Sequence, residues 1–455
     1  MFSFLIFLEL AIVLGGMVYV YAKTRDVFHP LFLILPTFGF IYGVMPYNLD
    51  DGRTLFKYLT PDQLVFVQAL NCAGTLAFVV GALAARLSVV RPHWEPQAPS
   101  VDFTQVLING ATVMGVIALT AWTIGLVNVG GFTNAFSKAY SGGWDSSGYI
   151  RDITIWMLGA IVLILLASTF SPLQLFQKFL LAVFASPWIA QAVLTARRGP
   201  TFMITVILAM SFYLNRNRRP SLLKIAGGGV LLGYAILFLV VNRSSLHLGT
   251  DLSEVNTEVS HAVAADDTGN EYIYGSGAII SAQKSERHFW GRRYAAQLLV
   301  RPIPSAIWTN KYEDFGISEV LVNGGTSEGF LDNLGWEGAV GSAPGIVADM
   351  WIEGRWFVLP GLFLVGWAYA RLWRRAIQDR GPWISQYIIA VSLSLYLVMQ
   401  TMEAVIFRFL LLSIPLWIVW KWAKYVGVPR LVPVLDLRPH RSRPSRDPRT
   451  AQEPA

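Results

Sequence analysis

The segment Leu222–Val241 reads LLKIAGGGVLLGYAILFLVV, and after it come 114 residues, Asn242–Arg355, with 8 Lys/Arg and 15 Asp/Glu. A second apolar run, Trp356–Trp373, follows this polar segment directly. Each apolar run is close to the ~20 residues that a helix needs to cross the hydrocarbon core of a bilayer. This order predicts a large loop, residues 242–355, held between two membrane-spanning helices.

The composition of the whole chain indicates a polytopic membrane protein. Hydrophobic residues make up 54% of the 455 residues, and only 14% are charged. Long apolar segments recur throughout, and mean hydropathy is +0.47, which is typical of several spanning helices rather than of a soluble globule. The single cysteine, Cys72, excludes a disulfide framework and a cysteine-based zinc site. The net charge of +7 lies mainly at the ends of apolar segments, so topology explains it and we expect no nucleic-acid partner.

The apolar segments predict an all-α fold of about 11 transmembrane helices. We expect these helices at Phe2–Tyr21, Pro30–Pro46, Leu64–Ala85, Val106–Val129, Ile153–Phe170, Phe179–Ala196, Thr201–Leu214, Leu222–Val241, Trp356–Trp373, Trp383–Met402 and Ile406–Trp420. Residues 1–241 would hold the first eight helices, 242–355 the large loop, 356–422 the last three helices, and 423–455 a basic, disordered tail.

The distribution of basic residues predicts the orientation. If the C-terminal tail lies on the cytoplasmic side, that side carries 21 Lys/Arg and the short loops opposite carry 7. The large loop is left out of this comparison, because long loops are translocated largely regardless of their charge. The positive-inside rule therefore predicts a cytoplasmic C-terminus and an extracytoplasmic large loop.

Several charged residues lie where this rule does not favour them. Arg197 and Arg198 occupy a tight outer turn, Glu403 and Arg408 lie at the outer ends of the last two helices, and Arg243 follows Val241. Arginine presents a planar fork of donors that fits phosphate oxygens, so these arginines are candidates for binding phosphate. The alternatives are snorkelling of Arg197 and Arg198 to lipid phosphates and a Glu403–Arg408 ion pair that closes the turn.

Three parts of the large loop are candidates for the site. Gly277–Leu299, which includes Arg293, has the spacing of amphipathic helices on the outer membrane face, where ordinary headgroup contact is the alternative. The turn Gly324–Glu328 could approach a ligand through its backbone or be an ordinary surface turn. On a predicted helix Ile346–Ile352, Asp349 and Glu353 are four residues apart and share one face, directed to a cavity or to solvent.

These features resemble the O-antigen or oligosaccharide repeat-unit polymerases (Wzy-type), within the wider GT-C-like group of lipid-linked glycan polymerases and O-antigen ligases. The resemblance rests on the helix number, the large C-terminal loop, and three local runs. These runs are Ala196-Arg-Arg-Gly199, Leu299-Val-Arg-Pro-Ile-Pro304 followed by Lys311, and Gly341-Ser-Ala-Pro344 followed by Asp349 and Glu353-Gly354.

The resemblance implies a glycosyltransferase of the bacterial inner membrane that works at the periplasmic face without a metal or other cofactor. It would transfer a glycan from undecaprenyl pyrophosphate to a sugar hydroxyl of an acceptor repeat unit that is also lipid-linked. Its partners would be these donor and acceptor glycans and membrane lipids, with a chain-length regulator and a flippase as further candidates.

The chemistry implied in this way assigns roles to charged residues. The departing pyrophosphate gains negative charge, so the candidate binding residues are arginines: Arg197, Arg198, Arg243, Arg293, Arg301 and Arg408. The acceptor hydroxyl needs a proton acceptor, for which Asp349 is the first candidate and Glu353, Glu328 and His288 follow. We expect no metal site, because the sequence contains no Asp-x-Asp or His-x-x-x-His and its histidines are scattered.

Two other functions remain open from the sequence. An O-antigen ligase of the same fold would pass the glycan to lipid A core. A polysaccharide or lipid transporter belongs to a different class, and it would place ionisable groups near the middle of the bilayer on broken helices. The unusual charges here gather at one outer edge, which argues against the transporter, and the run Arg301-Pro-Ile-Pro304 and the junction before Trp356 resemble the polymerases more than the ligases.

Overall fold

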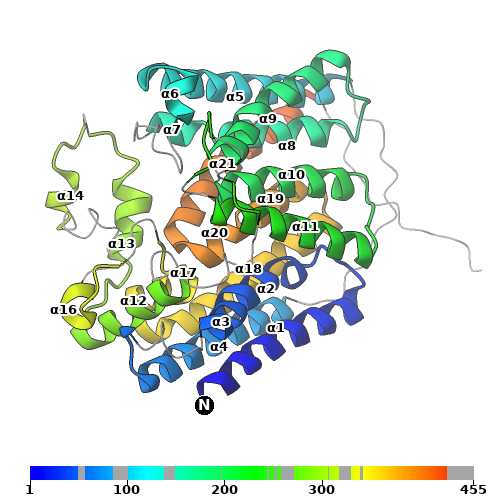
Figure 1. Cartoon of the computed structure of the whole chain (residues 1–455). Coiled ribbons are helices and arrows are strands. Elements are labelled where there is room, and N and C mark those ends of the chain that lie inside the picture. The colour runs from blue at the N-terminus through cyan, green and yellow to red at the C-terminus, as the bar shows by residue number, and fades with distance from the viewer. Residues whose placement is uncertain are drawn as a thin grey trace, which may run out of the picture.

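The structure is a computed structural model of the whole chain, and every regular element in its described part is helical (Figure 1). It describes residues 1–49, 57–85, 101–137, 149–195, 197–242, 245–250, 253, 255–257, 271–305, 307–316, 329–338 and 342–427. The predicted sites at Arg243 and at the turn Gly324–Glu328 lie outside these residues.

Ten helices of the described residues are long and apolar enough to cross a membrane, so the chain is a polytopic membrane protein. They are α1 (Phe2–Thr24), α2 with η1 and α3 (Pro30–Gly39, Phe40–Val44, Met45–Leu49), α4 (Pro61–Ala84), α5 (Val101–Asn128), α7 with α8 (Tyr149–Ile153, Trp156–Ala167), α9 (Leu175–Leu194), α11 (Leu222–Val241), α17 with η7 and α18 (Gly345–Gly354, Arg355–Phe357, Val358–Gln378), α19 with α20 (Pro382–Ser392, Ser394–Met399) and α21 (Met402–Gly427).

The remaining helices are shorter or more polar. They are α6 (Phe132–Phe136), α10 (Arg198–Asn215), α12 (Glu271–Ser285), α13 (Arg292–Ala295), η6 (Ala296–Val300), α14 (Lys311–Asp314) and α16 (Phe330–Leu334). Helix α10 corresponds to the predicted span Thr201–Leu214, and it packs against α9 and α19. The long helices lie side by side, and α12, α13, α14 and α16 lie together at one end of them, at the left of Figure 1.

Helices α4 and α18 cross at unusually short range because glycines face the partner backbone. A Cβ atom at Gly81 would lie 1.9 Å from the carbonyl oxygen of Phe363, and one at Gly366 would lie 2.1 Å from that of Phe78. Small residues at a helix crossing let two backbones approach closely, which is common between membrane helices. This crossing positions α17, which leads directly into α18.

We expect Gly81→Ala to destabilise the protein, because the obstructing atoms are backbone and cannot move aside as a side chain would. Overpacking of this kind costs about 1–3 kcal/mol, so the apparent melting temperature in detergent should fall by several degrees. The matched control is Gly229→Ala in α11, where no atom lies within 4 Å of the added Cβ. Equal melting temperatures for the two variants would contradict the close crossing.

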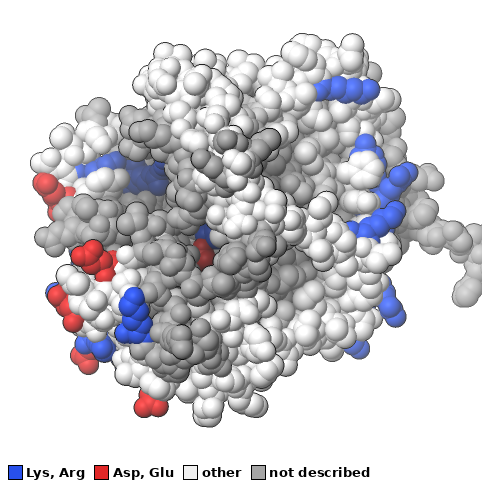
Figure 2. Space-filling view, in the orientation of Figure 1, with Lys and Arg blue, Asp and Glu red and all other residues white. Residues whose placement is uncertain are grey.

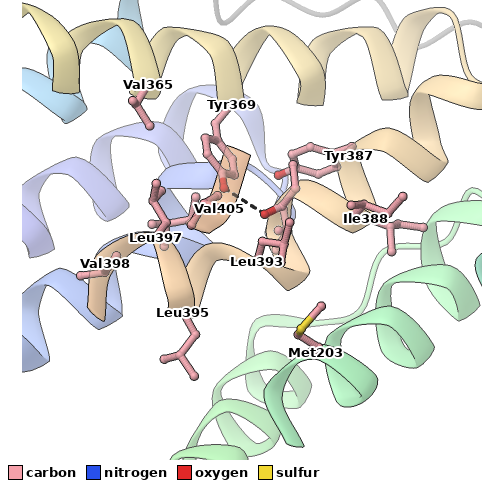
Figure 3. Packing of buried hydrophobic residues seen from close by; sticks show 14 of the residues in the cluster. Met203, Val365, Tyr369, Tyr387, Ile388, Leu393, Leu395, Leu397, Val398 and Val405 are labelled. Carbon is pink, nitrogen blue, oxygen red and sulfur yellow. Dashed lines mark hydrogen bonds between the residues drawn. The ribbon is translucent and has the colours of Figure 1, made fainter. Parts of the chain in front are cut away.

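Figure 3 shows a part of the buried core to which α10, α18, α19, α20 and α21 contribute. Leu393, Leu397 and Val398, near the junction of α19 and α20, are fully buried. The Tyr369 hydroxyl of α18 donates a hydrogen bond of 2.9 Å to the carbonyl oxygen of Ala390 in α19. This buried layer holds α20, and with it the start of α21, at a defined place relative to α17.

The large loop is only partly as the sequence predicts. A helix does precede α18, since α17 spans the predicted Ile346–Ile352. The expectation that Gly277–Leu299 lies on the outer membrane face is wrong for α12, because all its residues from Glu271 to Ala282 are buried. The physical reason is a close approach to α17, in which a Cβ at Gly275 would lie 2.4 Å from the carbonyl oxygen of Pro344.

Candidate functional site

The strongest candidate site is centred on Arg293, whose side chain is almost completely buried at the start of α13. Three carboxylates surround its guanidinium. Asp349 Oδ1 lies 2.5 Å from Nη2, Glu353 Oε1 lies 3.5 Å from Nε, and Glu403 Oε1 lies 3.5 Å from Nη2. All three carboxylates are themselves buried. We call Arg293, Asp349, Glu353 and Glu403 the Arg293 cluster.

Local structure explains how these groups come together. Asp349 and Glu353 share one face of α17 because they are four residues apart. The chain before α13 lies along the end of α17, where the amides of Trp290 and Gly291 donate to Glu353 O (2.6 Å) and Glu353 Oε2 (2.8 Å). Gly291 has φ +83°, a left-handed conformation that glycine adopts readily, and it directs Arg293 back towards α17.

Asp349 is the best-satisfied member of the cluster. Its Oδ1 accepts from Arg293, and its Oδ2 accepts from the Tyr294 hydroxyl at 2.6 Å and from the Met402 amide at 2.9 Å. Because these donors come from α13 and from the start of α21, Asp349 ties both elements to α17. A carboxylate with both oxygens engaged is better suited to positioning its neighbours than to accepting a proton.

Arg293 carries its charge inside the protein. Burial lowers the pKa of its guanidinium, but the nearby carboxylates of Asp349, Glu403 and Glu353 outweigh this effect and raise the pKa above its usual value. Burial, together with the negative charge of Asp349, raises the pKa of the Tyr294 phenol well above its usual value. Arg293 therefore stays a cation, and Tyr294 stays a neutral donor.

The cluster also contains buried polar atoms without a hydrogen-bond partner among the described residues. They are the donor Arg293 Nη1 and the acceptors Glu353 Oε1 and Glu403 Oε2. Buried polar atoms are nearly always paired, so such atoms in a native protein call for an explanation such as a ligand or ordered water. Figure 2 shows a hollow near the middle of the view with basic and acidic atoms at its floor.

A second group of predicted residues lies around Tyr396 of α20. The first residue of α10, Arg198, forms an ion pair with Glu271 at the start of α12. The next residue, Gly199, touches Tyr396, because an added Cβ would lie 1.8 Å from the tyrosine hydroxyl. On the other side, the Arg408 guanidinium stacks on the Tyr396 ring at 4.6 Å from its centroid.

These two groups belong to one end of the molecule. Arg408 and Glu403 lie on the same helix, α21, five residues apart, which is roughly 7.5 Å along the axis. Arg408 Nη1 also donates to Gln400 Oε1 at 3.4 Å, just before the start of α21. Gly199, the residue after Arg198, therefore shares Tyr396 with Arg408, and Arg408 lies on the same helix as Glu403 of the Arg293 cluster, although these residues come from distant parts of the chain.

The other predicted residues have different surroundings. Arg197 is the N-cap of α10 and is half-buried. Arg301 forms an ion pair of 2.7 Å with Asp152 and stacks on Phe407 at 4.9 Å, so it joins α7 to α21. Glu328, like Arg243, lies outside the described residues.

The alternative of a Glu403–Arg408 ion pair that closes a turn is not found among the contacts of the described residues. Helix α21 begins at Met402, four residues before the predicted start, so both side chains stand on helix rather than in a turn. Glu403 pairs with Arg293, while Arg408 donates to Gln400 and to the carbonyl oxygen of Ala404.

Sequence reasoning missed three residues of the site. Glu403 was noted only as an unusual charge, and neither Glu271 nor Tyr396 was singled out. The local signal for Glu403 was its position at a predicted membrane edge, where charged residues are commonly paired. No local signal marks Tyr396, whose importance arises from Gly199 and Arg408 on its two sides.

Among the described residues, no group of three or more His, Cys, Asp or Glu side chains could hold a metal ion. Comparison of the chain with protein-family models, with curated proteins and with solved structures found no match.

Proposed function

We propose that this protein polymerises lipid-linked oligosaccharide repeat units. It would transfer a glycan from undecaprenyl pyrophosphate to a sugar hydroxyl of an acceptor repeat unit. The observation that carries the proposal is the presence, on two residues in contact, of a buried donor, Arg293 Nη1, and a buried acceptor, Glu403 Oε2, neither of which has a hydrogen-bond partner among the described residues. A hydroxyl group donates one hydrogen bond and accepts another, so it suits both atoms.

In the proposed acceptor step, the sugar hydroxyl donates to Glu403 Oε2 and accepts from Arg293 Nη1. Its oxygen attacks the anomeric carbon of the donor, while Glu403 takes the proton as general base. The bond between this carbon and the pyrophosphate breaks as the new glycosidic bond forms, and undecaprenyl pyrophosphate leaves. Asp349 would position Arg293 and Tyr294, and Glu353 would help to hold the guanidinium.

In the proposed donor step, Arg198 and Arg408 stabilise the charge that develops on the pyrophosphate. Arg408 lies over the Tyr396 ring, Gly199 next to Arg198 approaches the hydroxyl of the same tyrosine, and 28% of the Arg198 side chain is exposed, so it is accessible to a ligand. Arginines that are already held in place need little rearrangement as charge develops, which lowers the barrier. The two arginines come from distant helices, α10 and α21.

The charge distribution supports the proposed location of this chemistry. In Figure 2 acidic side chains lie on the left, together with basic ones, and in the central hollow, whereas the right edge carries basic side chains only. The positive-inside rule then favours a cytoplasmic right-hand end and an extracytoplasmic Arg293 cluster. We propose the bacterial inner membrane as its site, with the large loop in the periplasm.

Deletion of the gene in its native organism tests the function. We expect the ladder of long surface glycans on a gel to collapse to single repeat units attached to their final acceptor. A ligase would instead leave long glycans on undecaprenyl pyrophosphate, with none attached to their final acceptor. A ladder of unchanged length would contradict the polymerase, and accumulation of unattached polymer would replace it by the ligase.

The donor step predicts that Arg198→Gln combined with Glu271→Gln shortens the glycans in the complemented deletion strain. The double substitution removes the ion pair as a whole, which avoids leaving Glu271 buried without a partner. Loss of one preorganised donor to a developing anion costs ~100-fold in rate. Arg216→Ala, at the other end of α10, is the matched control and should keep the full ladder. Full-length glycans from the double variant would remove Arg198 from the proposed site.

A further inference from the structure

The far end of α18 contains a cavity of about 490 Å³ that plays no part in the chemistry above. Helix α18 is 21 residues long, so this end lies roughly 30 Å from its start beside α17. The cavity is lined by Ala84 and Ala85 at the end of α4 and by Trp367, Arg371, Arg374, Arg375, Gln378 and Asp379. Its volume is within the usual range of small-ligand sites.

The shape of this cavity follows from the crossing of α4 and α18. The helices are in close contact at Gly81 and Gly366. Immediately beyond that crossing, α4 presents only Ala84 and Ala85, whose side chains are too small to fill the space next to Trp367. The cavity therefore results from the packing of α4 against α18, and its lining includes uncharged as well as charged side chains.

Three guanidiniums line the cavity in defined orientations. Arg371 stacks on Trp367 at 5.3 Å from the ring centroid, and Arg375 stacks on Trp383 at 4.2 Å. Arg374 donates from Nε to Gln378 Oε1 at 3.0 Å. Stacking uses the face of a guanidinium and leaves its N–H donors in the plane of the group for an anion. Asp379 is the single carboxylate of the lining, so two positive charges are in excess.

We propose that this cavity binds a dianionic group with two phosphates, supplied by the headgroup of a membrane lipid. Two excess charges match a lipid with two phosphodiesters, and arginine binds phosphate oxygens bidentately. Trp367, one helical turn before Arg371, is of the residue type that gathers at membrane–water interfaces. The same anion chemistry could come from soluble pyrophosphate, so the test includes both sources. The proposal does not depend on the proposed polymerase activity.

The test measures the apparent melting temperature of the purified protein in detergent against added cardiolipin, phosphatidylcholine or inorganic pyrophosphate. We expect cardiolipin to raise the melting temperature by several degrees, with saturation, because a ligand that binds only the folded state stabilises it. Phosphatidylcholine should have no such effect. Native mass spectrometry should show one retained cardiolipin molecule that resists removal.

Two kinds of variant separate a built site from general surface charge. Arg371→Gln with Arg374→Gln should weaken cardiolipin binding at least tenfold, whereas Lys421→Gln with Lys424→Gln, which removes the same charge from exposed positions of α21, should not. Ala84→Leu keeps every charge but fills the opening, and it should weaken binding to a similar extent.

Two results would overturn the proposed lipid site. One is equal cardiolipin affinity of the double arginine variant and the double lysine variant, and the other is an unchanged cardiolipin affinity of Ala84→Leu. Saturable binding of pyrophosphate as tight as that of cardiolipin, lost in the arginine variant, would support the anion site and assign it a soluble ligand.

Discussion

Arg293→Met should be the most damaging single substitution in the described part of the chain. Methionine is close to arginine in volume although it is shorter, so the main change is the loss of the cation that lies among Asp349, Glu353 and Glu403. Removing one partner of a buried ion pair costs about 3–5 kcal/mol, because the remaining charge stays buried without compensation. Here three carboxylates would be left, so we expect a strongly reduced yield of folded protein and a large fall in melting temperature.

The neighbouring Arg292 provides the matched control for this prediction. It is exposed, and among the described residues its side chain donates to the carbonyl oxygens of Phe315 and Gly316, at 3.3 and 3.2 Å. Arg292→Met should therefore leave the yield and the melting temperature close to those of the unmodified protein. Adding Asp349→Asn to Arg293→Met should recover part of the lost stability, because one uncompensated charge is removed. Equal melting temperatures for Arg293→Met and Arg292→Met would show that the cluster does not stabilise the fold.

Glu403→Gln should abolish glycan transfer while the protein remains folded. Glutamine has the same shape and keeps an oxygen for the contact with Arg293, but it cannot accept the proton of the acceptor hydroxyl. Loss of general base catalysis lowers rates by typically 10²–10⁴-fold. The measurement is the rate of ladder formation by purified protein with lipid-linked repeat units from the native organism.

Two comparisons make this second prediction specific. Glu313→Gln changes an exposed glutamate of α14 in the same way and should retain the full rate. Asp349→Asn should reduce the melting temperature as well as the rate, because Asp349 holds Arg293, Tyr294 and the Met402 amide together. A Glu403→Gln variant that forms ladders at the normal rate would exclude Glu403 as the base.

The helices could be predicted because the signal for each lies within its own segment. Leu222–Val241 was predicted with the bounds that the structure has, since a run of apolar residues reports its own burial in a membrane. The face shared by Asp349 and Glu353 was predicted for the same reason, because it depends only on helix periodicity. Predictions were less accurate where helices break, as at the start of α21.

The partners within the site could not be predicted from local patterns. Arg293 meets Glu403 across 110 residues and Arg198 meets Glu271 across 73. Gly275 lets α12 approach α17, so a stretch with the appearance of a surface helix is buried. In each case the contact depends on how two distant helices pack.

The sequence by itself determined that this is an all-helical membrane protein with a large loop before its last helices. Apolar length and charge bias are properties of single segments, and the bilayer acts on each segment in turn. Only the tertiary structure decided that Arg293 is enclosed by carboxylates from α17 and α21, and that arginines of α18 line a cavity beside α4. Those neighbours are selected by helix packing, where glycines and alanines set how closely two backbones approach and therefore which charges meet.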